Sequence, residues 1–284
     1  MQCYRPIEIF GGKTSSGNWR IGTGMTVPCG KCMGCKKQRA RDWSIRLFHE
    51  MIEHKRSCFI TLTYNDDNYP SDGSVSKREL QLFFKRLRKY YEERKIKYFA
   101  CGEYGERSER AHYHAIIFGI GGIKDLKLYA ASKKNGKDTF ASRTIEELWS
   151  LGNNVVGSVD IKSINYVVGY IRKKLGTKEY TDREPPFQLQ SQGLGLAYAE
   201  RNKERIETLN LTFNGEKVTV PRYYLKKLGK NQELINEHME RSAEKASKYA
   251  CERKLDVLEV RYRDRYQREL NQKALDSMKK RDGI

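Results

Sequence analysis

Long apolar runs are missing from the chain. No stretch approaches the roughly 18 apolar residues of a membrane-spanning helix, and the first twenty residues contain none that is typical of a signal peptide. We therefore expect a soluble intracellular protein. Its seven cysteines are odd in number, and without an export signal they favour thiols or metal ligands over a disulfide framework.

Acidic residues are in deficit. The chain has 55 Lys and Arg against 36 Asp and Glu, which gives a net charge of +19. Such an excess attracts polyanions, and nucleic acid is the first partner to consider. Residues 230–284 contain 14 basic and 11 acidic side chains, so +16 of the charge lies in residues 1–229. We expect the polyanion-binding surface in that part of the chain.

An ATPase motif is also missing. The stretch GGKTSSG at 11–17 contains the Gly-Lys-Thr of a phosphate-binding loop, but Ile7 stands where that loop requires glycine. Without such a motif the protein cannot unwind duplex nucleic acid by itself. It would need a helicase and a polymerase from its host.

The apolar patterns predict an α+β fold. After β-like runs near 4–10 and 19–27 and a basic helix near 36–54, strands are expected at 58–64, 97–105, 112–119 and 155–161. Helices are expected after a capping box of Ser76 and Glu79, at 144–152 and at 163–176, with a variable stretch from 119 to about 142. The order βαββαβ and a following helix is that of a ferredoxin-like antiparallel sheet.

We divide the chain into four regions. Residues 1–56 contain the N-terminal strands, a cysteine-rich element and the basic helix, and residues 57–180 contain the sheet core. Residues 181–230 form an extension with a hairpin at Asn214-Gly215 and a short helix. Residues 231–284 are predicted to form a charged helical tail.

Histidine is scarce, with five in the chain, yet two stand in the stretch RAHYHAIIFG at 110–119. Residues i and i+2 of a strand point to one face, so His112 and His114 lie side by side while Ala115 and Ile117 point the other way. Glu103 ends the preceding strand, where a carboxylate is unusual. Two histidines and one carboxylate leave coordination positions open for a divalent ion that also holds a phosphate. Glu106 and Glu109 of the intervening loop remain alternatives to Glu103.

The helix INYVVGYIRKKLG has two faces. At 100° per residue, its aliphatic residues form one stripe, which we expect to face the core. Tyr166, Tyr170 and Lys173 fall together on the other side, so the tyrosine hydroxyls point outward or towards another element. A tyrosine is a poor nucleophile at its usual pKa near 10, but a neighbouring cation or a metal-polarised phosphate makes it effective.

The cysteines cluster near the N-terminus. Cys29, Cys32 and Cys35 follow one another at two-residue gaps flanked by glycines, and Cys3 is available as a fourth ligand. Four thiolates favour a structural Zn²⁺ site, with an iron–sulfur cluster as the alternative.

Basic and aromatic residues are interleaved in the predicted core. Residues 76–97 contain nine basic and three acidic side chains, and tyrosines lie close by in sequence, as in proteins that hold single strands by charge and base stacking. We assign DNA contact to Thr61, Thr63, Tyr64, Arg86, Lys89 and Lys174.

Three motifs, FITLTY, HYHAIIF and YVVGYIRKK, occur in the order of the HUH endonucleases that initiate rolling-circle DNA replication. The chain most resembles the replication initiation (Rep) proteins of small single-stranded DNA phages of the Microviridae, gokushovirus branch. PCGKCMGCKKQRARDW, SQGLGLAY and PRYYLKK are also similar, so the resemblance extends to about residue 230.

The resemblance implies an activity and a site. Such enzymes bind Mg²⁺ or Mn²⁺ through the His-x-His pair and a third polar residue, and they nick a single-stranded origin with a motif tyrosine. The nick leaves a 5′-phosphotyrosine and a free 3′-hydroxyl, and a second tyrosine later allows the strand to be rejoined into a circle. Lys173 matches the family lysine after the second tyrosine. Gly169 stands where relatives often carry a lysine, so we expect unequal tyrosines, with Tyr170 initiating.

The resemblance also implies a location, the cytoplasm of an infected bacterial host. Two other interpretations stay open. The protein could be a zinc-stabilised nucleic-acid-binding protein without catalysis, in which the histidines are structural. It could also be a metallonuclease that activates water, with the tyrosines only positioning substrate.

Overall fold

The computed structural model describes residues 3–9, 12–13, 19–20, 25–92, 96–105, 108–120, 123–131, 138–173, 180–209, 211–213, 215–228, 267 and 270. The chain divides into two compact units, one of Ala40–Gly229 and one of the remaining residues. In the described part of the chain, no helix combines the length and apolar character needed to cross a bilayer. The predicted charged helices at 231–280 lie outside the described residues, apart from two isolated positions.

The N-terminal unit contains short paired strands. β1 (Ile7–Ile9) pairs antiparallel with β4 (Met25–Val27), and β2 (Gly12–Lys13) pairs with β3 (Trp19–Arg20). α1 (Met33–Glu53) then begins within the cysteine-rich stretch. The basic helix predicted near 36–54 is therefore confirmed and starts one turn earlier.

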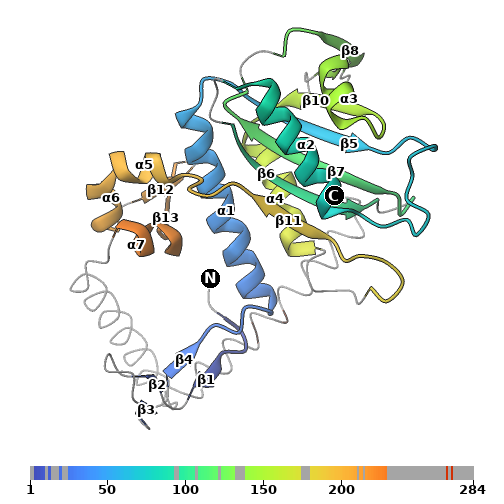
Figure 1. Cartoon of the computed structure of the whole chain (residues 1–284). Helices are drawn as coiled ribbons and strands as arrows, with labels where there is room; N and C mark the ends of the chain where they lie inside the picture. Colours follow the sequence, from blue (N-terminus) through green and yellow to red (C-terminus); the bar gives the residue numbers. More distant parts are fainter. Residues whose placement is uncertain are drawn as a thin grey trace. The chain divides into compact units, whose positions relative to one another are not determined.

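A seven-stranded antiparallel sheet forms the centre of the larger unit (Figure 1), in the order β11-β6-β7-β5-β10-β9-β8. The strands are β5 (Ser57–Thr63), β6 (Lys97–Tyr104), β7 (Ala111–Phe118), β8 (Leu126–Ala130), β9 (Thr139–Ser142), β10 (Asn154–Ser158) and β11 (Phe187–Gln190). The predicted α+β class with an antiparallel sheet is confirmed. The finer ferredoxin-like assignment stays a prediction.

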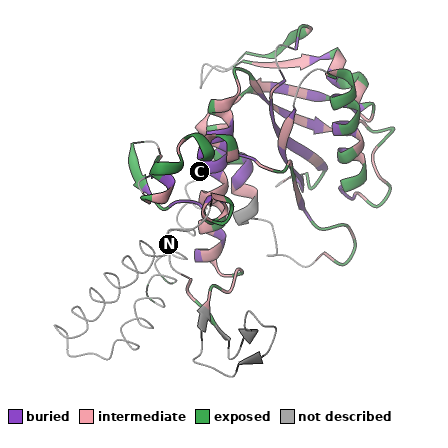
Figure 2. Ribbon diagram, turned by 60° about the vertical axis from the view of Figure 1, so that its left-hand side comes forward, coloured by how far each residue is buried: buried purple, intermediate pink, exposed green. Residues whose placement is uncertain are grey.

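One face of the sheet is covered by α2 (Lys77–Tyr90) and α3 (Arg143–Trp149). Leu80, Phe83 and Leu87 of α2 and Trp149 of α3 belong to the same buried cluster as Ile60, Leu62, Tyr113, Ala115 and Ile117 of the strands. Burial of apolar side chains at this helical spacing stabilises the layer. In Figure 2 the strands are mostly buried and the outer side of α2 is exposed.

The other face is covered by α1 and by α4 (Ile161–Lys173). Leu47 of α1 and Ile164, Val167 and Val168 of α4 are buried with the strand residues Phe99, Cys101, Ile116 and Phe118. Because side chains alternate along a strand, each central strand supplies one set of residues to each helical layer. This face carries the histidines, which belong to the same set as Ile116 and Phe118.

The capping box predicted at Ser76 is half realised. The Ser76 hydroxyl accepts a hydrogen bond from the Glu79 backbone N–H at 3.2 Å. The reciprocal bond is absent because the Ser76 N–H donates to the Tyr113 hydroxyl at 2.7 Å, while the Glu79 carboxylate accepts from the Tyr64 hydroxyl. Tertiary partners have taken the place of the local one.

The stretch treated as variable contains two strands. β8 and β9 extend the sheet beyond β10, and all five residues of β8 are exposed. An edge strand that is exposed throughout lacks the alternation by which strands are identified from sequence. β11 at the opposite edge was also not predicted.

The segment after β11 contains α5 (Leu196–Arg201), α6 (Lys203–Glu207), the hairpin β12 (Leu211–Phe213) and β13 (Glu216–Val218), and α7 (Arg222–Leu228). The hairpin predicted at Asn214-Gly215 is confirmed by the pairing of Phe213 with Glu216. Buried residues of this segment, such as Ile206 and Tyr224, pack around Ile45 of α1.

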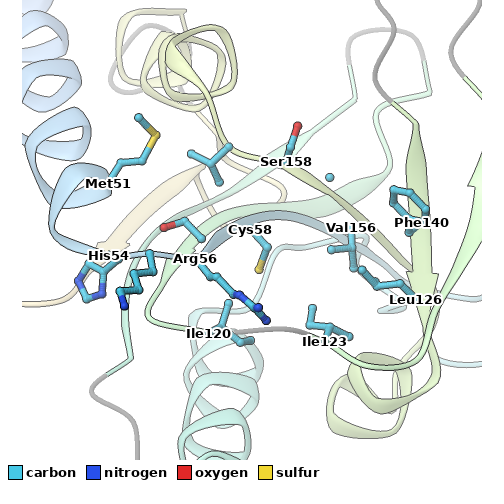
Figure 3. A pocket seen from close by; sticks show the side chains of 14 residues that line it. Met51, His54, Arg56, Cys58, Ile120, Ile123, Leu126, Phe140, Val156 and Ser158 are labelled. Atoms are coloured by element: carbon cyan, nitrogen blue, oxygen red, sulfur yellow. The ribbon is translucent and has the colours of Figure 1, made fainter.

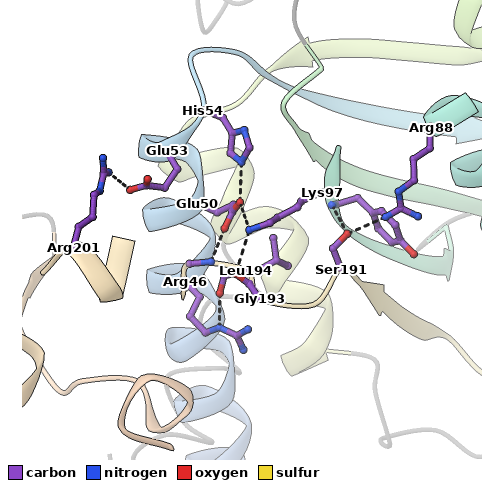
Figure 4. Close-up of polar contacts among 12 residues, drawn as sticks. Arg46, Glu50, Glu53, His54, Arg88, Lys97, Ser191, Gly193, Leu194 and Arg201 are labelled. Carbon is purple, nitrogen blue, oxygen red and sulfur yellow. Dashed lines mark hydrogen bonds and ion pairs between the residues drawn. The ribbon is translucent and has the colours of Figure 1, made fainter. Parts of the chain in front are cut away.

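A buried carboxylate anchors this segment to α1 (Figure 4). Glu50 of α1 bonds to His54 at 2.8 Å and to Lys97 of β6 at 2.9 Å, and accepts from the Gly195 N–H at 2.6 Å. Gly195 has φ +76°, and a Cβ there would lie 2.8 Å from the Arg46 carbonyl oxygen. The glycine-rich SQGLGLAY stretch is therefore explained by close backbone approach to α1.

Candidate functional site

The two histidines of β7 point to the face covered by α1 and α4. In the sheet register His112 lies opposite Glu103 of β6 and Thr63 of β5, while His114 lies opposite Cys101 and Thr61. Ala115 and Ile117 belong to the buried cluster on the other face, as predicted.

Glu103 lies between the two imidazoles. Its Oε1 atom is 3.0 Å from His112 Nε2 and 3.2 Å from His114 Nε2. One ligand atom from each of the three residues can be chosen so that all lie within 4.8 Å of one another. Glu103 is 2% exposed, and the His112 side chain, at 18%, is the most accessible of the three. A carboxylate and two imidazoles at this spacing form a three-donor set for a divalent ion.

The electrostatics keep the carboxylate ionised. Burial alone would raise the pKa of Glu103, but hydrogen bonds from His112 and His114 outweigh burial and lower that pKa to about 2. The side chain therefore carries its negative charge at neutral pH, as a metal ligand requires.

The second ring nitrogens are also engaged. His112 Nδ1 donates to the Arg110 carbonyl oxygen at 3.0 Å, and His114 Nδ1 lies 2.9 Å from the Thr61 hydroxyl. Hydrogen bonds at Nδ1 orient the rings and leave Nε2 for the ion. Thr61, predicted to contact DNA, lies where it holds a histidine.

The two tyrosines of α4 face this cluster. The Tyr166 and Tyr170 rings lie 5.3 and 5.5 Å from the His114 ring, and 5.1 Å from each other. Tyr166 stands edge-on to His114 and is 52% exposed, whereas Tyr170 is half-buried and stacks on it. Of the two orientations left open by the helix pattern, the one towards another element is observed, and the aliphatic stripe is buried as predicted.

The surroundings of Tyr170 disfavour its phenolate. Burial, the Tyr166 hydroxyl and the nearby Glu103 charge all raise the pKa of Tyr170. Its hydroxyl is therefore protonated at neutral pH.

Among the alternative carboxylates, Glu109 is engaged elsewhere, since its side chain pairs with Arg183 at 2.7 Å. Glu106 lies outside the described residues. Lys173 is the last residue of α4, and Lys174 and the Lys173 side chain lie outside the described part. Glu103 is the carboxylate that the structure brings to the histidines.

The residues assigned to DNA contact are spread over the molecule. Tyr64 is 4% exposed and packs in the core beside Tyr113 and Trp149, so its ring is not available for base stacking. It has the same strand parity as Ile60 and Leu62, a signal that could have identified it as a core residue. The Thr63 hydroxyl lies 3.5 Å from the Asn153 carbonyl oxygen.

Arg86 and Lys89 lie on α2, which covers the face opposite the histidines. Arg86 donates to the Leu148 carbonyl oxygen at 3.0 Å, and Lys89 is exposed.

A pocket of about 470 Å³ lies at the other end of β5 (Figure 3). Its walls are mainly apolar, with Cys58, Ile120, Ile123, Phe140 and Val156, and the Arg56 side chain reaches into it. The pocket has no part in the histidine cluster, which lies at the end of β5 that contains Thr61 and Thr63.

The four N-terminal cysteines Cys3, Cys29, Cys32 and Cys35 also come together, with one sulfur from each within 4.8 Å of every other. Both metal-type clusters predicted from the sequence are therefore present as clusters of side chains.

Comparisons with known proteins agree with this arrangement. Residues 57–175, which include the whole histidine and tyrosine site, match the family model of the replication-associated protein ORF2. No solved structure matches.

Three relatives cover most of the chain. The replication-associated protein ORF2 of Spiroplasma virus 4 is 34% identical over 78% of this chain and 74% of the relative. The replication-associated protein VP4 of Bdellovibrio phage phiMH2K is 30% identical over 79% and 76%. The replication-associated protein ORF4 of Chlamydia phage 1 is 30% identical over 75% of this chain and 55% of the relative. The chain therefore belongs to the family of the replication-associated protein ORF2, with relatives among phages of the Microviridae type.

Proposed function

We propose that this protein initiates rolling-circle replication by nicking single-stranded DNA at an origin with a tyrosine. The observation that carries the proposal is the approach of Tyr166 and Tyr170 to within 5.5 Å, ring to ring, of a histidine that belongs to a three-donor cluster. Membership of a family of replication-associated proteins supports DNA as the substrate.

The cluster of Glu103, His112 and His114 would hold Mg²⁺ or Mn²⁺. Its donor set fits, because an ionised carboxylate and two Nε2 atoms converge while Nδ1 hydrogen bonds orient both rings. When bound, the ion would polarise the scissile phosphate.

The tyrosines supply the nucleophile. The phenol oxygen bonds to phosphorus, the bond from phosphorus to the 3′ oxygen breaks, and the phenol proton is lost to solvent while the 3′ oxygen gains one. The products are a 5′-phosphotyrosine and a free 3′-hydroxyl. Because the phosphodiester is kept as an ester, a later 3′-hydroxyl can attack it and close the strand into a circle.

The environments of the two tyrosines differ. Tyr166 is 52% exposed, whereas Tyr170 is half-buried against His114 and its pKa is raised. We therefore assign the first cut to Tyr166, in place of the sequence-based expectation for Tyr170. Tyr170 would act second, when the first tyrosine is already linked to DNA.

The proposal implies partners. A nicked circle leaves a 3′-hydroxyl that a polymerase extends, and we expect a host helicase and a host polymerase to act with this protein in the cytoplasm of the infected bacterium. Lys173, Lys174, Arg86 and Lys89 remain proposed contacts of the DNA backbone.

The test is incubation of the full-length protein with circular single-stranded origin DNA and Mn²⁺ or Mg²⁺, followed by a denaturing gel. We expect a protein–DNA adduct that survives denaturation and maps to Tyr166 or Tyr170. Cleavage without an adduct would identify a water-using metallonuclease. Binding without cleavage under any of these conditions would identify a DNA-binding protein without catalysis.

A further inference from the structure

We propose that the four N-terminal cysteines bind a single tetrahedral Zn²⁺ ion that ties residue 3 to the first turn of α1. The site is separate from the histidine cluster and lies outside residues 57–175, the part that matches the family model. The proposal does not depend on the nicking activity.

The sulfur separations carry the argument. Cys3 Sγ lies 3.6 Å from Cys29 Sγ and 3.8 Å from Cys32 Sγ, and Cys29 Sγ lies 4.0 Å from Cys35 Sγ. A disulfide requires about 2.05 Å, so these sulfurs are not bonded to one another. Four thiolates around one zinc ion, with Zn–S bonds of about 2.3 Å in tetrahedral geometry, lie about 3.8 Å apart. The observed separations match the edges of that tetrahedron.

The same distances decide against an iron–sulfur cluster. In a cluster the four cysteines bind two or more iron atoms bridged by sulfide, so sulfurs on different irons stand farther apart than ligands of one ion. Here all four sulfurs lie within 4.8 Å of one another. The cluster alternative left open by the cysteine spacing is therefore not favoured.

The local backbone supports thiolates. The Cys29 N–H donates to Cys3 Sγ at 3.3 Å, the Cys32 N–H to Cys29 Sγ at 3.3 Å, and the Tyr4 N–H to Cys32 Sγ at 3.4 Å. Hydrogen bonds to sulfur stabilise its charged form. Gly30 has φ +72°, which lets the chain turn between the first two cysteines of the run.

The charges around the site fit as well. Four thiolates with one Zn²⁺ carry a net charge of −2, and the stretch 28–41 contains five basic residues and no acidic residue, namely Lys31, Lys36, Lys37, Arg39 and Arg41. Part of the positive charge of this stretch therefore offsets the metal centre instead of adding to a DNA-binding surface.

All four positions of the tetrahedron are filled by protein sulfur, which makes the site structural. Without the ion, four thiols would remain within van der Waals range of each other around an empty centre. Metal binding therefore supplies folding free energy to the N-terminal unit, where the described elements besides α1 are strands of only two or three residues.

The first experiment is metal analysis of the full-length protein purified without added metal. We expect about one zinc per chain in the wild type, in the His112→Ala/His114→Ala double variant and in the Cys58→Ser control, whose thiol is buried in the sheet core. Cys32→Ser should lose the zinc. Iron, with or without labile sulfide, or no metal in the wild type would overturn the proposal.

A second experiment avoids variants that fail to fold. Wild-type protein is treated with a thiol-alkylating reagent before and after a zinc chelator, and labelled peptides are identified by mass spectrometry. Cys3, Cys29, Cys32 and Cys35 should be protected before chelation and labelled together after it. Labelling of these four cysteines without the chelator, or labelling of only one or two after it, would contradict a four-thiolate site.

Discussion

The two clusters of ligand-type side chains differ in where their donors come from and in what surrounds them. The four cysteines are soft donors, three of them within seven consecutive residues, Cys29–Cys35. Glu103, His112 and His114 are hard and intermediate donors placed by the pairing of two strands. The first cluster uses four donors for four positions, whereas the second provides three and has two tyrosines beside it.

The difference teaches how the two clusters are held. Glu103 and the histidines hydrogen-bond to one another in the absence of an ion, because the carboxylate accepts from both rings. The cysteines offer only weak sulfur contacts to each other. We infer that the histidine cluster is preorganised by the sheet, while the cysteine cluster depends on its metal.

The largest expected effect is that of replacing both histidines. His112→Ala/His114→Ala should lower the cleavage rate by at least about 100-fold, because nothing then polarises the scissile phosphate. Affinity for single-stranded DNA should change by less than about twofold, since it arises from distributed phosphate contacts. Cleavage assays and fluorescence anisotropy measure the two quantities. Cleavage at the wild-type rate would remove the histidine cluster from the chemistry.

The tyrosine pair comes next. Tyr166→Phe and Tyr170→Phe should each retain some covalent adduct, with the larger loss in Tyr166→Phe, and the double variant should form none. Circle closure should fail in either single variant, because it needs a second nucleophile while the first is occupied. Denaturing gels and peptide mapping of the linked fragment provide the readout. An adduct on any other residue would defeat the mechanism.

Acid should separate the two clusters through Glu103. Its pKa is lowered from 4.5 to about 2 in the folded protein, so the unfolded state binds a proton first as the pH falls. Its contribution is fully present above pH 4.5 and disappears as the pH approaches about 2, and the loss is on the order of 3 kcal/mol. Urea unfolding of chelator-treated protein at several pH values measures it. Glu103→Gln should lack this component, and an equal acid loss in that variant would contradict the assignment.

Thr61 tests how the histidine cluster is oriented. Thr61→Val removes the hydroxyl that lies 2.9 Å from His114 Nδ1 and should weaken Mn²⁺ binding about 10- to 100-fold in calorimetric titrations. Thr61→Ser should restore most of the affinity. The matched control is Thr63→Val, on the same strand and face, whose hydroxyl lies near the Asn153 carbonyl oxygen instead of a ring. Equal weakening by both valines would indicate a general packing effect.

The smallest expected effect concerns α2, which covers the face opposite the histidines. Lys89→Glu should weaken binding of single-stranded DNA a few-fold at low salt and less at high salt. The cleavage rate at saturating DNA should not change, because the residue lies away from the cluster. Lys226→Glu, an exposed lysine of α7, makes the same change of charge elsewhere. An equal effect of the two variants would show that α2 has no specific role in binding.

Local patterns were sufficient for several features of the fold. Alternation along β7 predicted that His112 and His114 share a face, and the aliphatic stripe of α4 predicted its buried side. Two-residue gaps predicted that the cysteines of the run gather. These predictions hold because strand and helix periodicities are set by backbone geometry alone.

Other features depend on residues far apart in sequence. β8, β9 and β11 are edge strands defined by their partners, and Tyr64 is buried because its strand lies between others. The Ser76 N–H binds a tyrosine from β7 instead of the local glutamate. In each case a distant partner overrides or completes a local preference.

The amino-acid sequence by itself therefore determined the donor types, the strand and helix that carry them, and the positive charge that favours a polyanion. Only the tertiary structure decided that Glu103 is the third donor, that Thr61 holds His114, and that both tyrosines face the cluster. The physical reason is register. A shift of one residue between β6 and β7 would turn Glu103 to the opposite face, and that register is selected by the packing of two helical layers on the whole sheet.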